Sequence, residues 1–368
     1  MYLKTAQIKN FRNIKSAELS FSPNVNVILG KNAQGKTNLL EAIWLLSGNK
    51  SFRGATDKEI CAFEENSYYI GAKFCDSDEE IRLSIGCDTG SDKPIKKVLR
   101  GEKKYSTQRA LLGAVPMTVF SPDDLELIKA GPINRRNYCD SLLCMLFPAY
   151  AKSLSRYNRI VSQKNALLRD EAETSVIEIW NEQLALFGAS IIKSRIELLK
   201  RLLNPAQSCF YDMAGQTESL DIEYKCTVCE NADIDEAELC NIFKKKLSEN
   251  AYKEQSAGAC LYGPHRDDLE VKINEKSARQ FASQGQQRSA VLALLLAKTQ
   301  LLKNHTGKTP IVLLDDVMSE LDEGRQRYLL EKIEDFQVLI TCCQEEILGG
   351  RQNKTFCVSD GKICEKED

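Results

Sequence analysis

The hydrophobic and polar positions of the first fifty residues follow a strand, loop and helix order. Residues 2–8 and 17–21 alternate apolar and polar side chains, which predicts two short strands joined by a turn at residues 10–13. The apolar run at 25–29 predicts a buried third strand, and residues 38–46 repeat apolar side chains at helical spacing. A glycine-containing loop therefore lies between a strand and a helix.

The middle of the chain changes from a strand pattern to a helix pattern. Residues 68–99 alternate with a period of two, which predicts an antiparallel sheet. Residues 115–120 are a further strand candidate, after which Ser121 is placed to cap a helix with Pro122 in its first turn. Long helical periods follow at residues 134–146, 150–169 and 176–203. A second, mainly helical lobe is expected here.

The last third returns to alternating elements, which is typical of a parallel sheet with crossover helices. The expected order is a helix at 287–302, a strand at 311–314, a helix at 324–333 and a strand at 337–341. These strands are expected to rejoin the N-terminal lobe. The predicted division is a first lobe of residues 1–120 and 305–368 and an inserted lobe of residues 121–304.

Composition narrows the class of protein. With 43% hydrophobic and 28% charged residues the chain is an ordinary globular protein, and it contains neither a signal-peptide pattern nor an apolar run that would span a membrane. A cytoplasmic location without membrane partners is expected. The net charge of -2 requires any DNA contact to come from a local patch. The 14 cysteines are expected to be reduced, and Cys226 and Cys229 are interpreted as strand residues, because no second pair completes a zinc site.

The loop before the first predicted helix carries the strongest chemical signal. It matches the pattern G-x-x-x-x-G-K-[ST] with Gly30, Lys31, Asn32, Ala33, Gln34, Gly35, Lys36 and Thr37. In such a loop, backbone N–H groups and the helix N-terminus bind the phosphates of a nucleotide. Lys36 is expected to contact the β- and γ-phosphates of ATP, and Thr37 is expected to contact Mg²⁺. The sequence therefore predicts an ATP site.

Two aspartates follow the apolar strand at 311–314. Asp315 is the candidate that holds Mg²⁺ beside Thr37, and Asp316 is the candidate that polarises the attacking water. Lys36, Asp315 and Asp316 are thus the predicted catalytic residues. The segment that follows, which includes Asp322, resembles the D-loop of ABC ATPases, which lies between two nucleotide sites.

A third segment opens the apolar helix near residue 287. Ser283, Gly285 and Gln286 lie at its start and resemble the ABC signature, in which a serine, a glycine and a helix N-terminus bind the γ-phosphate held by a second subunit. A plain helix cap is the alternative. The order of the motifs favours an α/β fold with an ABC-type P-loop ATPase lobe containing a mixed sheet, plus the helical insertion. It also predicts an ATP-bound homodimer.

Together these residues resemble the RecF family of repair ATPases, which are related to SMC proteins. Further segments that carry the resemblance are residues 10–13 (NFRN), 35–42 (GKTNLLEA), 51–53 (SFR), 120–125 (FSPDDL), 132–140, 263–268 (GPHRDD) and 281–289. The resemblance implies slow, DNA-stimulated ATP hydrolysis and binding of double-stranded DNA near single-strand gaps. It also implies cooperation with RecR and RecO in loading RecA.

Several residues remain open on sequence alone. The candidate DNA-contacting residues are Lys93, Lys96, Lys97, Arg100, Lys103 and Lys104, for which a solvated face is the alternative. Arg135 and Arg136 either steady the second lobe or touch the DNA backbone. His265 is interpreted as a structural brace near the signature helix, and Thr341 is a candidate γ-phosphate contact.

The resemblance implies an ATP-switched clamp on DNA, and two other functions compete with it. A transporter-type ATPase is opposed by the helical insertion and by Thr341-Cys342-Cys343, which stand where such ATPases carry a histidine. An ATPase subunit of a nuclease-based defence system would need a separately encoded partner enzyme.

Overall fold

The computed structural model describes residues 1–77, 79–343 and 354–366. The chain forms two compact units, one made of residues 1–125 and 295–368 and the other of residues 126–294. The sequence placed these boundaries after residues 120 and 304, and so assigned nearly all of helix α10 (Gln284–Thr306) to the inserted lobe. The structure divides α10 instead, because its C-terminal part packs in the first unit, where the Thr299 hydroxyl lies 3.1 Å from that of Thr118.

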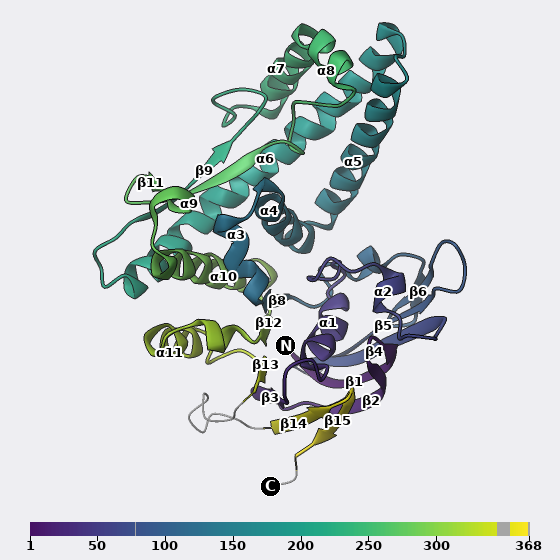
Figure 1. Ribbon diagram of the computed structural model, residues 1–368, viewed down its shortest axis with the longest axis vertical. Coiled ribbons are helices and arrows are strands. Elements are labelled where there is room, and N and C mark those ends of the chain that lie inside the picture. The colour runs from purple at the N-terminus through teal and green to yellow at the C-terminus, as the bar shows by residue number, and fades with distance from the viewer. Residues whose placement is uncertain (78, 344–353, 367–368) are drawn as a thin grey trace. The chain divides into compact units, whose positions relative to one another are not determined.

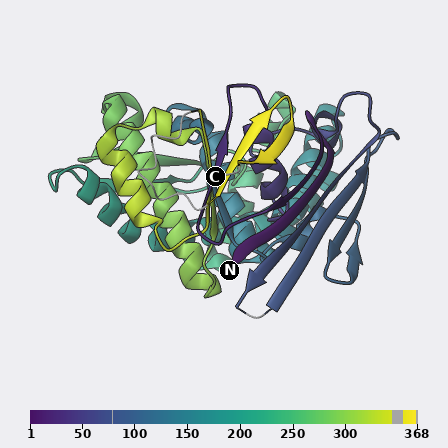
Figure 2. The ribbon, with the colours of Figure 1, turned by 90° about the horizontal axis from the view of Figure 1, so that it is seen from below.

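The first unit contains a six-stranded antiparallel sheet in the order β2-β1-β4-β5-β6-β7. Its strands are β1 (Tyr2–Phe11), β2 (Ile14–Ser20), β4 (Ser67–Asp76), β5 (Glu79–Asp88), β6 (Ile95–Arg100) and β7 (Lys103–Tyr105). Figure 2 shows these strands side by side as a twisted layer. The turn expected at residues 10–13 is shorter, because Phe11 still pairs with Ile14 and only residues 12 and 13 connect the strands.

A second sheet of the same unit is mixed and has the order β15-β14-β3-β13-β12-β8. Its strands are β3 (Val25–Leu29), β8 (Met117–Phe120), β12 (Ile311–Asp315), β13 (Val338–Cys342), β14 (Lys354–Ser359) and β15 (Lys362–Glu365). All pairs are parallel except β14 with β15. Strands β12 and β13 are buried throughout, as their continuous apolar runs require. The parallel order brings the carboxyl ends of β3 and β12 to one edge. Figure 1 shows β12, β13 and β3 next to one another.

Short and medium helices complete the described part of the first unit. They are α1 (Lys36–Leu45), α2 (Asp57–Ile60), η1 (Gln108–Leu111), η2 (Pro122–Leu125), η3 (Val317–Glu320) and α11 (Glu323–Lys332). The helix expected after Ser121 is present as the 3-10 turn η2, which continues directly into α3 (Glu126–Lys129), but the expected cap is reversed. Both the Ser121 backbone N–H and its hydroxyl donate to the Asp124 carboxylate, at 2.7 and 2.9 Å.

The second unit consists of helices and one small sheet of order β11-β10-β9. Its elements are α3 (Glu126–Lys129), α4 (Pro132–Leu146), α5 (Pro148–Arg169), α6 (Thr174–Met213), β9 (Leu220–Lys225), α7 (Glu236–Glu249), α8 (Ala251–Ala257), β10 (Asp268–Ile273), β11 (Lys276–Ser277), α9 (Ala278–Phe281) and the start of α10. Helix α6 does not end near residue 203 as the sequence suggested, but continues through Pro205. Ala206 and Phe210 beyond the proline are fully buried, and their packing offsets the missing backbone hydrogen bond.

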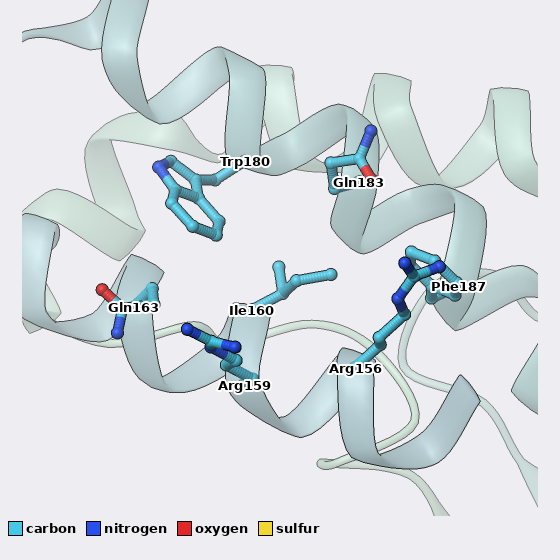
Figure 3. A pocket seen from close by; sticks show the side chains of 7 residues that line it. All are labelled: Arg156, Arg159, Ile160, Gln163, Trp180, Gln183 and Phe187. Carbon is cyan, nitrogen blue, oxygen red and sulfur yellow. The ribbon is translucent and has the colours of Figure 1, made fainter. Parts of the chain in front are cut away.

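A groove of about 480 Å³ lies between α5 and α6. Its lining comprises Arg156, Arg159, Ile160, Gln163, Trp180, Gln183 and Phe187. Figure 3 shows that the first four come from one helix and the others from the facing helix. The Arg156 guanidinium lies 5.5 Å from the centre of the Phe187 ring, so a cation–π interaction also joins the two helices.

Across the described ranges, the helices are either too short or too polar to cross a lipid bilayer.

Candidate nucleotide-binding site

The P-loop runs from the end of β3 to the start of α1, in the strand, loop and helix order that the sequence predicted. Lys36, the first residue of α1, is almost fully buried. Its ammonium group donates to the backbone carbonyls of Gly30 at 2.9 Å and Lys31 at 3.3 Å. The lysine is thus held inside the curve of the loop, where phosphate-binding lysines act.

Gly35 has a backbone conformation that explains the glycine at this position. Its φ of 115° is a left-handed value that side chains rarely adopt, and a Cβ would lie 2.7 Å from Oδ1 of Asn13. The Asn13 amide also donates to the carbonyl of Gln34 at 2.9 Å and accepts from Asn38 at 2.8 Å. Asn13 therefore supports the loop from the turn between β1 and β2.

The acidic strand meets the P-loop through hydrogen bonds to Asp315. The Thr37 hydroxyl donates to Asp315 Oδ1 at 2.8 Å, and the buried Thr341 hydroxyl lies 3.0 Å from the same oxygen. Burial raises the pKa of Asp315, with a smaller rise from the charge of Asp316, whereas the bonds from Thr37 and Thr341 act to lower it. The contact joins two segments that the sequence placed 278 positions apart.

Asp316 follows in the left-handed conformation, with a φ of 50°. Its backbone N–H donates to the Thr341 hydroxyl at 2.8 Å, which holds the backbone at this residue. The Asp316 carboxylate is 35% exposed and lies 3.9 Å from the Lys36 ammonium. Asp316 therefore presents an accessible acid beside the lysine, while Asp315 is buried next to it.

The thiol of Cys343 lies on the open side of the loop. Its sulfur is 3.5 Å from the Lys36 ammonium and 3.1 Å from Oδ1 of Asn32. Lys31, Asn32 and Ala33 are exposed, so this side of the loop is accessible to a ligand. Thr341, the candidate γ-phosphate contact, lies within β13, and its hydroxyl contacts Asp315 and the backbone of Asp316.

The donor set near Thr37 fits Mg²⁺. The hydroxyl of Thr37 and the carboxylate of Asp315 are both oxygen ligands and lie within hydrogen-bond distance of each other. Magnesium prefers oxygen ligands and is commonly bound by one or two carboxylates together with substrate phosphates. These two residues would therefore hold a magnesium ion bound with a nucleotide.

A buried carboxylate links three of the sequence segments that carry the family resemblance. Glu41 on α1 is fully buried and accepts two hydrogen bonds from the Arg12 guanidinium, at 2.8 and 3.0 Å. The Ser51 hydroxyl donates to the same carboxylate, and Arg53 lies 3.7 Å from it. The network anchors the helix that carries Lys36 and Thr37, and sequence reasoning did not assign it.

The turn between β14 and β15 also contacts the loop, a contact that was not expected from the sequence. The backbone N–H of Asp360 donates to Oε1 of Gln34 at 2.7 Å, and that of Gly361 donates to the Gln34 carbonyl at 3.0 Å. Gln34 is thus held by a hairpin more than three hundred residues further along the chain. The only local signal was the Asp-Gly pair, which is typical of a hairpin turn.

Ser283, Gly285 and Gln286 lie in the second unit, at the start of α10. The Ser283 hydroxyl accepts from the Gln286 backbone N–H at 3.2 Å, and the Gln286 side chain accepts from the Ser283 N–H at 2.8 Å. This reciprocal pair is a capping box, so the helix cap considered from the sequence is present. Gln286 also donates to Glu218. Ser283 remains exposed, and a second role at the helix N-terminus is compatible with the cap.

Asp322, the D-loop candidate, caps α11. Its carboxylate accepts from the Arg325 backbone N–H at 3.0 Å and forms an ion pair with the Arg325 guanidinium. These contacts lower the pKa of Asp322, chiefly through the backbone hydrogen bond. About half of the Asp322 side chain is exposed, so its carboxylate stays ionised at the protein surface.

The basic stretch forms the β6–β7 hairpin but divides between its two faces. Lys96 lies on the same side as the buried Val98 and pairs with Asp57 at 2.8 Å. The register puts Lys103 opposite Arg100, and Lys104 opposite Leu99 on the other face. Lys93 and Lys97 are exposed. A single patch of six cations is therefore not formed, and Lys96 is already paired.

The arginine pair of the second unit has an internal role. Arg135 is buried, donates to Asp268 at 2.7 and 3.0 Å, and also binds three carbonyls near the end of α3. Arg136 donates to the carbonyl of Asp267 at 2.8 Å. Of the alternatives that the sequence left open, these contacts favour steadying the lobe.

His265 is a structural residue by its contacts. Its ring nitrogens lie 2.7 Å from the Tyr157 hydroxyl on α5 and 3.2 Å from the Cys260 carbonyl. Burial lowers the pKa of His265 to about 4, so the ring is neutral near pH 7. Its partners are α5 and its own loop, whereas the sequence had placed its bracing role near the signature helix.

Cys226 and Cys229 are not strand residues as expected. Strand β9 ends at Lys225, and both cysteines lie in the irregular segment after it. Within the described residues, no cluster of three potential metal ligands occurs, and Cys226 and Cys229 are not joined in a disulfide.

Comparison with known proteins adds the family. Residues 2–362 match the RecF/RecN/SMC N terminal domain family. "DNA replication and repair protein RecF" of Thermoanaerobacter pseudethanolicus is 37% identical over 366 residues, with 99% of each chain covered. The protein of the same name from Clostridioides difficile is 35% identical over 377 residues, covering 100% of this chain and 99% of the relative.

Solved structures agree with the sequence relatives. The recombination mediator protein RecF with ATPrS, from the RecFOR pathway, has a TM-score of 0.93 at 35% identity, with 100% of this chain and 98% of that chain covered. A Pyrococcus furiosus Smc head domain has a TM-score of 0.56 at 14% identity, covering 100% and 96%. The second likeness supports the fold alone. The expected α/β fold with a mixed sheet and a helical insertion is confirmed.

Proposed function

Because this chain belongs to the RecF family, a group of ATPases related to SMC proteins, we propose that it is an ATP-switched DNA clamp that acts in recombinational repair and replication. Binding of ATP drives association of two copies, and hydrolysis releases them. The observation that carries the proposal is the Thr37–Asp315 hydrogen bond of 2.8 Å, because it unites the P-loop with the acidic strand in one site.

The nucleotide is held by the P-loop residues 30–37. Lys36 provides the positive charge for the β- and γ-phosphates, and the N-terminus of α1 adds its dipole. The relative with a TM-score of 0.93 was solved with ATPrS, and another RecF structure with a TM-score of 0.92 was solved with ATP. Both support ATP as the ligand.

Asp315 and Thr37 would hold a magnesium ion, which would offset phosphate charge when bound with the nucleotide. The chain's own contribution to hydrolysis is the carboxylate of Asp316, which orients the attacking water and accepts its proton. Asp316 is accessible, its carboxylate lies 3.9 Å from the Lys36 ammonium, and its backbone is held by the bond to Thr341. A carboxylate on a short side chain has limited reach, which supports slow turnover.

A second copy completes the site through the start of α10. Ser283 and Gly285 stand at the N-terminus of a helix of 23 residues, where backbone N–H groups and the helix dipole favour an anion. Gln286 keeps Ser283 oriented through the capping box. Asp322 lies after η3 at the surface and is the proposed D-loop residue at the interface between the copies.

The nucleic-acid substrate is double-stranded DNA near single-strand gaps, and RecR and RecO are the protein partners in loading RecA. The names of the relatives, which place RecF in replication, repair and the RecFOR pathway, support this assignment. DNA stimulates the slow hydrolysis. The exposed cations of the β6–β7 hairpin, Lys97 and Lys104 on one face, remain candidates for phosphate contacts.

The proposal is tested by sedimentation of the purified chain with and without ATP and gapped DNA. Wild type is expected to dimerise with ATP, whereas Lys36→Met and Ser283→Arg stay monomeric and Asp316→Asn remains dimeric because hydrolysis is blocked. Ser256→Arg, an exposed serine on α8 in the same unit, is the matched control for the added charge. A wild-type chain that hydrolyses ATP as a monomer, equally fast with Ser283→Arg, would contradict the proposal.

A further inference from the structure

Two cysteines face each other on the C-terminal hairpin. Strands β14 and β15 are joined by Asp360 and Gly361, whose φ values of 48° and 74° are those of a two-residue turn with both residues left-handed. The antiparallel register places Cys357 directly opposite Cys364. Both are free, and both are exposed.

The pairing brings the two thiols within disulfide range. Ser359 and Lys362 close the turn as a hydrogen-bonded pair, and because such pairs alternate along the ladder, Cys357 and Cys364 form one as well. Their Cα atoms are therefore separated by about 5.5 Å. Disulfides join Cα atoms about 4.4–6.8 Å apart, most often near 5.5–6 Å. The backbone already holds the pair at a bridging distance.

The inner and outer faces of this hairpin have different roles. Phe356 and Val358 are buried, and the Phe356 ring packs 5.2 Å from that of Phe21. Cys357 lies between them in sequence and faces outward. The hairpin is held in place through its inner face, so the outward cysteines are available for chemistry without disturbing the core.

The same hairpin supports the nucleotide loop through its turn. Asp360 and Gly361 donate their backbone N–H groups to Gln34. A Cβ on Gly361 would lie only 1.9 Å from the carbonyl oxygen of Asn13, so the turn is seated directly on the segment that supports Gly35. A change in the pairing of β14 with β15 is therefore passed to the P-loop over a short path.

We propose that Cys357 and Cys364 are a redox modification site, at which a peroxide forms a reversible disulfide that weakens nucleotide binding. One thiolate attacks the peroxide oxygen and becomes a sulfenic acid as the O–O bond breaks. The second thiol displaces that hydroxyl as water and forms the S–S bond. In total two thiols lose two electrons and two protons, and hydrogen peroxide becomes two waters. Dithiols reverse the step.

The geometry of the hairpin predicts how the disulfide changes ATP binding. Cβ atoms of opposed residues lie about 4.5–5.5 Å apart, whereas a disulfide holds them near 3.8 Å. Closing the bridge draws β15 toward β14 and moves the turn that binds Gln34. Loss of one of the two bonds to Gln34 is expected to weaken ATP binding by about fivefold. This regulatory effect rests on the proposed ATP site, but the disulfide itself does not.

Mass spectrometry tests the bridge directly. Trypsin cleaves after Lys354, Lys362 and Lys366, which separates Cys357 from Cys364 into peptides 355–362 and 363–366. Peroxide treatment of the folded full chain is expected to join these peptides, and dithiothreitol is expected to release them. Cys357→Ser must abolish the linked species, while Cys343→Ser, at the P-loop, must keep it. Failure to detect the link in the folded wild type overturns the proposal.

Titration with a fluorescent ATP analogue tests the effect on binding. The reduced wild type is expected to bind, and the oxidised wild type is expected to bind about fivefold more weakly. Cys364→Ser is expected to show no peroxide effect. If the reduced protein binds no nucleotide, the proposed function fails while the disulfide result stands. If the bridge forms and affinity is unchanged, the regulatory inference fails while the proposed function stands.

Discussion

Replacing Thr341 by valine removes one hydroxyl from between the two aspartates and keeps the shape of the side chain. That hydroxyl accepts from the backbone N–H of Asp316 at 2.8 Å and lies 3.0 Å from Oδ1 of Asp315. Thr341 is fully buried, so water cannot replace either bond. Asp315 Oδ1 keeps its hydrogen bond from Thr37, so one buried group, the Asp316 N–H, is left unsatisfied, and the free energy of unfolding is expected to fall by roughly 1–3 kcal/mol.

The same change is expected to alter the metal site. Asp315 loses one of the two hydrogen bonds that oppose the rise in its pKa, so that pKa rises further. Mg²⁺ requires the ionised carboxylate. The magnesium concentration needed for half-maximal nucleotide binding should therefore increase, and the increase should be larger at acidic pH.

Urea denaturation and magnesium titrations with a fluorescent nucleotide measure both effects. Thr341→Ser is the matched control, because it keeps the hydroxyl and loses one methyl group, at a cost of about 1 kcal/mol. Valine should therefore be clearly worse than serine in both assays. If the two variants have the same stability and the same magnesium requirement, the hydroxyl does not support the aspartates as described.

Three further predictions concern buried charge. The pKa of His265 is lowered to about 4 in the folded protein, whereas the unfolded value is near 6.5. As the pH falls below about 6.5, the unfolded chain binds a proton at this residue and the folded protein does not, so the folded state loses stability. Between about pH 7 and pH 5 the free energy of unfolding should drop by roughly 2 kcal/mol more in wild type than in His265→Gln. Glu41→Gln leaves Arg12 without its buried carboxylate and should cost about 2–4 kcal/mol in urea denaturation, whereas the exposed control Glu64→Gln should be neutral. Because burial raises the pKa of Asp315, magnesium-dependent nucleotide binding should decline on acidification above the ordinary aspartate value of about 3.9, and Asp315→Asn should lose the magnesium dependence at every pH.

The elements that the sequence predicted well are those with a local pattern. Strand β3 has the expected bounds, and the P-loop and α1 follow it, because an apolar run, two glycines and a helical period are all contiguous. The meeting of Asp315 with Thr37 was expected as well, since the carboxyl ends of parallel strands in one sheet share one edge. Local sequence patterns together with sheet topology were therefore enough to predict this part of the nucleotide site.

Other features depend on contacts between distant segments. Glu41 reads as an ordinary helix acid, and only its burial against Arg12 and Arg53 shows otherwise. Pro205 normally ends a helix, yet the burial of Phe210 carries α6 past it. No sequence period connects Gln34 with the turn at Asp360, so that support could not be predicted.

The order of strands in the mixed sheet affects how the protein is made. Strand β3 lies between β13 and β14, which the ribosome synthesises about three hundred residues later. Until then both edges of β3 lack their partners and the P-loop lacks the turn that holds Gln34, whereas residues 126–294 already form a compact unit of their own. During translation the helical unit is thus free to fold first, and the nascent chain acquires the ability to bind nucleotide only after β13 and β14 have been made.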